Sequence, residues 1–126
     1  MCTIFVGFYI LTAQASNEGT KIPTSQTKIE IPTGPIANGT CVGFIQSLGF
    51  DYHGNAKDWK EYINSYFPEV GEVMLTNESS LGHLSFITKV SFGKIEIIEQ
   101  NFKGWGVIST RSVSMFDQDI IGFIKR

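Results

Sequence analysis

The sequence predicts an α+β domain in which helices come first and strands follow. The chain has 126 residues, of which 42% are hydrophobic and 17% charged, so it is long enough for one domain with a core and too short for two. Two segments with apolar residues at helical spacing lie between residues 41 and 66, and five short segments of strand character follow. We therefore expect N-terminal helices packed on an antiparallel sheet of about five to six strands.

Residues 1–15 predict a secretory signal peptide. They carry no charge, contain an apolar run over residues 4–11 and close on Ala13-Gln14-Ala15, which fits an A-x-A cleavage site. The run is shorter than the about 20 apolar residues of a membrane span, and a buried N-terminal strand is the alternative. Cleavage would give a secreted protein with no stable membrane association.

Residues 16–35 predict a linker or extended arm, because Thr, Ser, Gly and Lys are frequent and three prolines exclude a helix. Within this arm, residues 29–31 alternate between apolar and charged side chains and are a weak candidate for an edge strand. The folded domain is therefore expected over residues 36–126.

The cysteine count favours a chemical role for Cys41. Cys2 lies in the predicted signal, so cleavage would leave one cysteine and no intramolecular disulfide. An unpaired cysteine is an oxidation liability in an exported protein, which favours a thiol kept for its reactivity. Free cysteines are also often buried, so a packing role stays open.

The first helix is predicted to begin at or just before Cys41, since residues 38–40 supply turn and cap chemistry and apolar residues recur at helical spacing up to Leu48. The second is predicted over residues 56–66, with Pro68 soon after its end.

Five strands separated by turn residues are predicted after these helices, and the turns indicate an antiparallel meander. The strands are expected at residues 71–76, 83–90, 94–100, 106–111 and 120–125.

The charge pattern excludes a nucleic-acid-binding surface. The formal net charge is -2, and Lys and Arg are scattered along the chain instead of clustered. Nucleic acid is therefore not an expected partner.

A nucleophile and a base are indicated by Cys41 and His83. A thiol attacks carbonyls as the thiolate, which the unpaired N–H groups at a helix start favour. Histidine is the residue type suited to act as a base near neutrality, and the sequence contains two, His53 and His83. We prefer His83 because it follows Gly82 at the opening of a predicted strand, whereas His53 lies in a polar loop where histidines are usually solvated.

A catalytic histidine also needs an acceptor that fixes its tautomer. Glu99 and Asn101 end the strand after that of His83, and their spacing of two places them on one face of it. Either side chain is a candidate partner of His83, and the spacing does not separate them.

Six segments in a fixed order resemble the CHAP family, the cysteine- and histidine-dependent amidohydrolases and peptidases. The resemblance covers about residues 36–124. Its segments are Gly39-Thr40-Cys41, Gly54-Asn55-Ala56-Lys57-Asp58-Trp59, Val70-Gly71-Glu72-Val73, Gly82-His83-Leu84-Ser85-Phe86-Ile87, Ile98-Glu99-Gln100-Asn101-Phe102 and Gly104-Trp105-Gly106.

The resemblance implies a small papain-like α+β fold, related to the NlpC-type peptidases. It also implies a peptidoglycan substrate, cut at the amide between glycan and stem peptide or within the peptide. Carried over by position, Cys41 matches the nucleophile, His83 the general base, Glu99 the orienting residue and Asn101 a further polar member of the site.

Trp59 and Trp105 match aromatic positions of the family. We expect both to pack in the core, with substrate binding by Trp105 as the alternative. Many members have Gln before the cysteine and an aromatic residue two positions after it, where this chain has Thr40 and Gly43. The backbone N–H of Cys41 is then the donor that remains for an oxyanion.

No metal or cofactor is expected. Some members of the family bind calcium through acidic residues upstream of the cysteine, but residues 32–41 contain no Asp or Glu.

The sequence therefore predicts a monomeric, secreted or cell-wall-associated enzyme that hydrolyses peptidoglycan through an acyl-enzyme. The alternative is a CHAP-fold module that binds the cell wall with weak or no turnover. The altered residues around Cys41 support this alternative.

Overall fold

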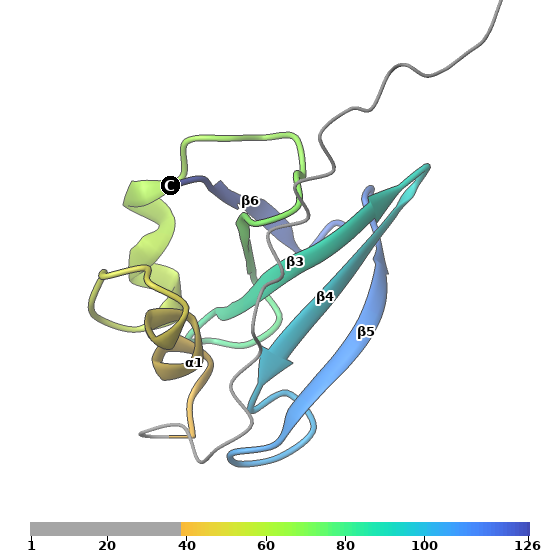
Figure 1. The fold of residues 1–126 in the computed structure, drawn as a ribbon. Coiled ribbons are helices and arrows are strands. Elements are labelled where there is room, and N and C mark those ends of the chain that lie inside the picture. The colour runs from red at the N-terminus through yellow and green to blue at the C-terminus, as the bar shows by residue number, and fades with distance from the viewer. Residues whose placement is uncertain (1–38) are drawn as a thin grey trace, which may run out of the picture. The chain divides into compact units, whose positions relative to one another are not determined.

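A computed structural model describes residues 39–126 of the chain. The predicted signal peptide, the predicted linker and the candidate strand at residues 29–31 lie outside the described residues. No helix within residues 39–126 is long and apolar enough to cross a membrane. The elements, labelled as in Figure 1, are α1 (Cys41–Ser47), the 3-10 helix η2 (Ala56–Tyr62), β2 (Val73–Thr76), β3 (His83–Ser91), β4 (Lys94–Gln100), β5 (Ile108–Ser114) and β6 (Ile120–Ile124).

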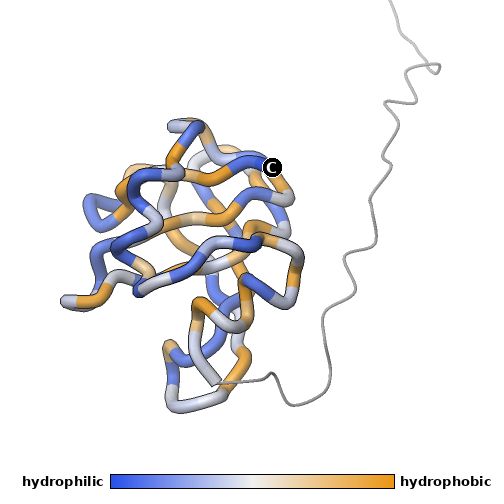
Figure 2. The backbone as a smooth tube through the Cα atoms, turned by 90° about the vertical axis from the view of Figure 1, so that its left-hand side faces the viewer, coloured by the Kyte–Doolittle hydropathy of each residue, from blue (hydrophilic) through white to orange (hydrophobic). Residues whose placement is uncertain are grey.

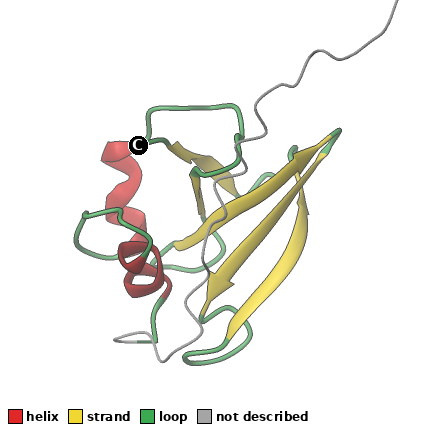
Figure 3. Cartoon of the chain, viewed as in Figure 1, coloured by secondary structure: helices red, strands yellow, loops and turns green. Residues whose placement is uncertain are grey.

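The fold is α+β, as the sequence predicts, with one antiparallel sheet of five strands in the order β5-β4-β3-β2-β6. Strands β2 to β5 form the expected meander. The last strand, β6, does not extend it beyond β5 but pairs with β2 at the opposite edge. The helical segments pack on the sheet, α1 against β3 and β4 and η2 against β2, β3 and β6 (Figures 1 and 3).

The helix α1 begins where the cap pattern predicts. The Thr40 hydroxyl accepts a hydrogen bond from the Gly43 N–H at 2.9 Å, which satisfies one of the unpaired donors of the first turn. Phe44 and Ile45 are fully buried, and α1 packs against β3 and β4. This packing holds the first residue of the helix, Cys41, close to the start of β3.

The second helical segment is shorter than predicted and is a 3-10 helix, η2. The Asp58 carboxylate accepts from the Asn55 N–H at 2.8 Å and caps its start. Its end is set by the sheet, because the N–H groups of Asn64 and Ser65 donate to the Phe123 carbonyl of β6. A helix up to residue 66, as predicted, would need these N–H groups for hydrogen bonds within the helix. They bond to β6 instead, so the helix ends earlier.

Side chains of the strands form a buried hydrophobic cluster. Its buried members come from all five strands and are Met74, Ile87, Ile95, Ile97, Val113 and Phe123. Figure 2 shows the hydrophobic and hydrophilic segments that alternate at short intervals along the chain. Such alternation is what strands with one buried face require.

The strand β5 lies further along the chain than the predicted residues 106–111. Asn101 and Gly106 adopt positive φ angles of 69° and 75°, so the chain between β4 and β5 is a loop. The strand itself is mostly polar, with Val113 as its one buried residue. An edge strand of this composition carries little apolar alternation, which is why the sequence pattern misplaces it.

Candidate active site

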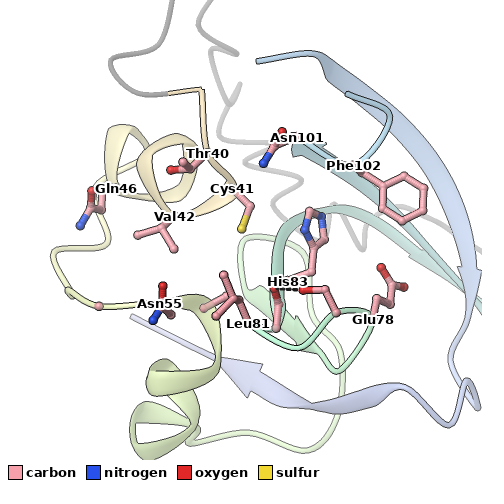
Figure 4. A pocket seen from close by; sticks show the side chains of 14 residues that line it. Thr40, Cys41, Val42, Gln46, Asn55, Glu78, Leu81, His83, Asn101 and Phe102 are labelled. Carbon is pink, nitrogen blue, oxygen red and sulfur yellow. Dashed lines mark hydrogen bonds between the residues drawn. The ribbon is translucent and has the colours of Figure 1, made fainter. Parts of the chain in front are cut away.

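An open pocket of about 630 Å³ lies where the starts of α1, η2 and β3 and the loop after β4 meet. Cys41, His83 and Asn101 all line it, so three of the four predicted catalytic residues share one cavity. Figure 4 shows the Cys41 sulfur pointing toward the His83 ring, with Asn101 beside them. The volume falls in the range typical of ligand pockets.

Cys41 is a free, partly exposed cysteine at the first position of α1. Burial raises the pKa of its thiol, but a hydrogen bond with His83 and backbone hydrogen bonds with Leu84 and Val42 outweigh this, so the pKa lies below its ordinary value. The thiolate, which is the nucleophilic form of cysteine, is therefore favoured.

His83 is held by a close contact between the turn before β3 and the start of η2. The Lys57 N–H donates to the Leu81 carbonyl at 2.8 Å. Gly82 has a φ of +76°, and a Cβ there would lie 2.8 Å from the Lys57 backbone nitrogen. The glycine is needed for both its backbone conformation and its lack of a side chain, and together these contacts fix His83 at the pocket.

The partner of His83 is Glu99. His83 Nε2 lies 3.0 Å from Glu99 Oε1, and the Glu99 side chain is fully buried. This contact uses Nε2 and leaves Nδ1 for Cys41. Burial lowers the pKa of His83, but the hydrogen bonds with Cys41 and Glu99 outweigh it and raise the pKa to about 9.

The two shifts together favour an ion pair of Cys41 thiolate and His83 imidazolium. The carboxylate charge of Glu99 persists because its own pKa is lowered: burial raises it, but hydrogen bonds from His83 and Arg111 outweigh that effect. A thiolate beside a protonated imidazole supplies both a nucleophile and a proton donor, which is what acyl transfer requires.

Asn101 occupies a different position from Glu99. The strand alternation that would place both on one face does not extend to Asn101, because β4 ends at Gln100 and Asn101 has a φ of 69°. Its backbone N–H donates to the Val107 carbonyl at 3.0 Å, and its side chain lines the pocket. The structure thus separates two residues that the spacing could not.

Arg111 and Glu78 belong to the same cluster, although no pattern in the sequence indicated either residue. Arg111 Nε donates to Glu99 Oε2 at 2.6 Å, and Arg111 Nη2 donates to Glu78 Oε1 at 2.6 Å. No local signal marks Arg111, because its place beside Glu99 comes from the strand register: Arg111 pairs with Ile97, and its side chain lies diagonally next to Glu99 on one face of the sheet. The predicted strand ended at Arg111, and Glu78 lay in a predicted turn.

The other predicted positions divide between core and surface. His53 lies in a loop with its side chain 81% exposed, as expected. Trp59 is fully buried, which confirms its packing role. The same expectation is wrong for Trp105, which is 73% exposed and lies against Gly39, because the loop after β4 carries it away from the core.

In the part of the chain that the structure describes, no group of three His, Cys, Asp or Glu side chains is placed to hold a metal ion.

Several solved structures share this fold. The crystal structure of Ly7917 matches with a TM-score of 0.57 and 15% identity over 70% of this chain and 53% of that one. Its complex with the hydrolysing product of MDP matches with the same TM-score. An N-acetylmuramoyl-L-alanine amidase from Staphylococcus aureus matches with a TM-score of 0.52 and 24% identity, over 61% of this chain and 27% of that one.

The chain therefore spans about half of Ly7917 and about a quarter of the amidase. No curated protein sequence matches it. The family model of the CHAP domain matches residues 32–101, which is more than half of the chain and includes Cys41, His83 and Glu99. On this match, and with the α+β fold that it shares with these structures, the chain belongs to the CHAP domain family.

Proposed function

We propose that this domain hydrolyses an amide or peptide bond of peptidoglycan, with Cys41 as the nucleophile and His83 as the general acid and base. The proposal rests on the arrangement of Cys41, His83 and Glu99 in this member of the CHAP family. Cys41 and His83 line the pocket, and Glu99 contacts His83 from behind. The arrangement provides a nucleophile, a base and an orienting group in contact.

In the proposed reaction, the Cys41 thiolate attacks the carbonyl carbon and the carbonyl π electrons move to oxygen. The oxyanion lies near the backbone N–H of Cys41. When the C–N bond breaks, His83 gives its proton to the leaving nitrogen. His83 then takes a proton from water, which attacks the thioester and releases the acid and the thiolate. Glu99 stabilises the imidazolium at each stage where it is charged.

Peptidoglycan as the substrate is supported by the family and by two structural neighbours, an N-acetylmuramoyl-L-alanine amidase and a protein solved with the hydrolysing product of MDP. Trp105 is the proposed substrate-binding residue, because its exposed ring lies against Gly39, two residues before Cys41. A flat aromatic surface of this kind suits a sugar ring or a peptide. We also propose that the protein acts outside the cell and that it is a monomer.

The alternative is a wall-binding module with weak or no turnover. It is favoured by Thr40, which occupies the position of the usual Gln and uses its hydroxyl to cap α1 by accepting from Gly43. Such a module has no need of a cysteine and a histidine whose pKa values are moved toward an ion pair, and for this reason we prefer the enzyme.

The deciding experiment is digestion of purified peptidoglycan followed by mass spectrometry of the soluble products. Glycan strands free of peptide would identify an amidase, and split stem peptides or cross-bridges an endopeptidase. Protein that sediments with the wall but releases no new fragment would contradict the proposed enzyme and support the binding module.

A further inference from the structure

The Glu99 carboxylate uses both of its oxygens, and one neighbour supplies most of its bonds. Oε1 contacts His83 Nε2 at 3.0 Å and also accepts from Arg111 Nη2 at 3.3 Å, while Oε2 accepts from Arg111 Nε at 2.6 Å. Because Glu99 has no exposed surface, water does not replace these bonds. A buried carboxylate of this kind is stable only with a cationic partner.

His83 cannot be that partner throughout the reaction. In the proposed mechanism, it loses its charge each time it gives its proton to the leaving nitrogen. Arg111 keeps its charge at every stage, since a guanidinium does not titrate in this range. The positive charge that Glu99 requires while His83 is neutral therefore comes from Arg111.

Arg111 is itself fixed from two directions. Its Nη2 donates to both oxygens of Glu78, at 2.6 Å and 2.9 Å, and Glu78 lines the pocket. Its guanidinium carbon lies 3.8 Å from the centre of the Phe102 ring, which in turn contacts the ring of His83. The guanidinium plane is thus held between Glu78, Phe102 and Glu99, and its Nε edge faces Glu99.

We propose that Arg111 is a positioning residue of the catalytic site, which keeps Glu99 ionised and directed at His83 through its forked hydrogen bonds, with Glu78 as its anchor. The proposal rests on the proposed function and adds to it a residue that does not contact the reacting atoms.

The proposal predicts whether the pKa of His83 rises or falls when Arg111 is removed. If Arg111 were only a nearby positive charge, its removal would relieve repulsion and raise the pKa of His83. If Arg111 holds Glu99 ionised, its removal lets the buried carboxyl take up a proton or turn away, and the imidazolium loses its partner. The pKa of His83 then falls.

The test is an NMR titration of the His83 ring in wild type, Arg111→Met and the control Lys89→Met. Lys89 also pairs with a glutamate of β4, Glu96, at 3.7 Å, but on the exposed surface. We expect Arg111→Met to lower the pKa of His83 by about one pH unit or more, and Lys89→Met to leave it unchanged. A pKa of His83 in Arg111→Met that is unchanged or higher would overturn the proposal.

Arg111→Lys keeps the inference testable if Arg111→Met does not fold. An ammonium retains the charge but cannot bond Glu99 and Glu78 through one planar fork, so a smaller fall in the pKa of His83 is expected. A pKa equal to wild type or above it would overturn the proposal. Because the titration needs no substrate, a failure to cleave peptidoglycan counts against the proposed function alone.

Discussion

His83 and Glu99 lie on the neighbouring antiparallel strands β3 and β4, and the 3.0 Å contact from His83 Nε2 to Glu99 Oε1 is closed off from solvent. The contact decides which ring nitrogen faces the pocket. With Nε2 bound to the carboxylate, Nδ1 is the nitrogen left for Cys41, and the ring cannot turn without breaking a buried bond to a charged group.

Removal of the nucleophile is expected to abolish turnover and leave the fold intact. Cys41→Ala should lower the rate of peptidoglycan cleavage by at least about a thousandfold, because no other group replaces the thiolate. Its circular dichroism spectrum should match that of wild type. His53→Ala is the control and should cleave normally, as its side chain lies in solvent. Undiminished cleavage by a folded Cys41→Ala protein would remove Cys41 from the mechanism.

Glu99 and Asn101 are expected to differ in importance. Glu99→Gln keeps the shape of the side chain but removes the charge that stabilises the imidazolium, so kcat should fall by more than about tenfold. Asn101→Ala should cost less, since Glu99 holds the contact with His83. If Asn101→Ala were the more damaging change, Asn101 would be the orienting residue.

The pH profile of peptidoglycan cleavage should be bell-shaped, and its alkaline limb should depend on the contact between His83 and Glu99. The imidazolium is present below the raised pKa of His83, about 9, and is lost as the pH rises through it. Because Glu99 is one of the groups that raise this pKa, Glu99→Gln should bring the alkaline limb to lower pH. An alkaline limb that stays in place would show that the Glu99 charge does not act on His83.

Gly82 is expected to be intolerant of a side chain. Gly82 and Gly93 have nearly equal φ angles of +76° and +77°, but a Cβ at Gly82 would lie 2.8 Å from a backbone atom, whereas at Gly93 it would meet open space. Gly82→Ala should therefore cost about 1–3 kcal/mol more in free energy of unfolding than Gly93→Ala. Chemical denaturation measures both. Equal losses would mean that backbone strain alone matters at Gly82.

Trp105 is expected to act on binding more than on chemistry. Trp105→Ala should raise KM by about tenfold, the value of a lost aromatic contact, with a small change in kcat. Phe116→Ala, at the turn between β5 and β6, removes a similarly exposed aromatic residue and should leave KM unchanged. A KM equal to wild type in Trp105→Ala would exclude the proposed substrate contact.

Metal ions are expected to have no influence on the rate. Chelation with EDTA should leave peptidoglycan cleavage unchanged, and added calcium or zinc should not raise it, because the proposed chemistry uses only protein groups. Loss of activity on chelation, restored by one metal, would contradict this expectation.

Local signals predicted the helix start at Cys41, the strand start at His83 and the strand over Lys94–Gln100. Each depends on neighbouring residues, through a cap, a glycine or alternating side chains. The Thr40 cap and Gly82 are visible in the sequence as residue types, and for this reason Cys41 and His83 could be proposed as nucleophile and base from the sequence alone.

The features that could not be predicted from the sequence depend on contacts between distant segments of the chain. The place of β6 beside β2 and the early end of η2 both depend on backbone bonds across the sheet. The pairing of Arg111 with Glu99 depends on the register of β5, a strand with too little apolar alternation for its register to be read.

The three proposed catalytic side chains come from a helix and two strands, so no hairpin or single helix contains a working site. Cys41 meets His83 only after α1 has docked on the paired strands β3 and β4. Contacts between segments so far apart in the chain form slowly, because loop closure must come first. During refolding from denaturant, recovery of the proposed hydrolysis should therefore follow the appearance of secondary structure and coincide with burial of Trp59, so that this reaction would mark the completion of folding.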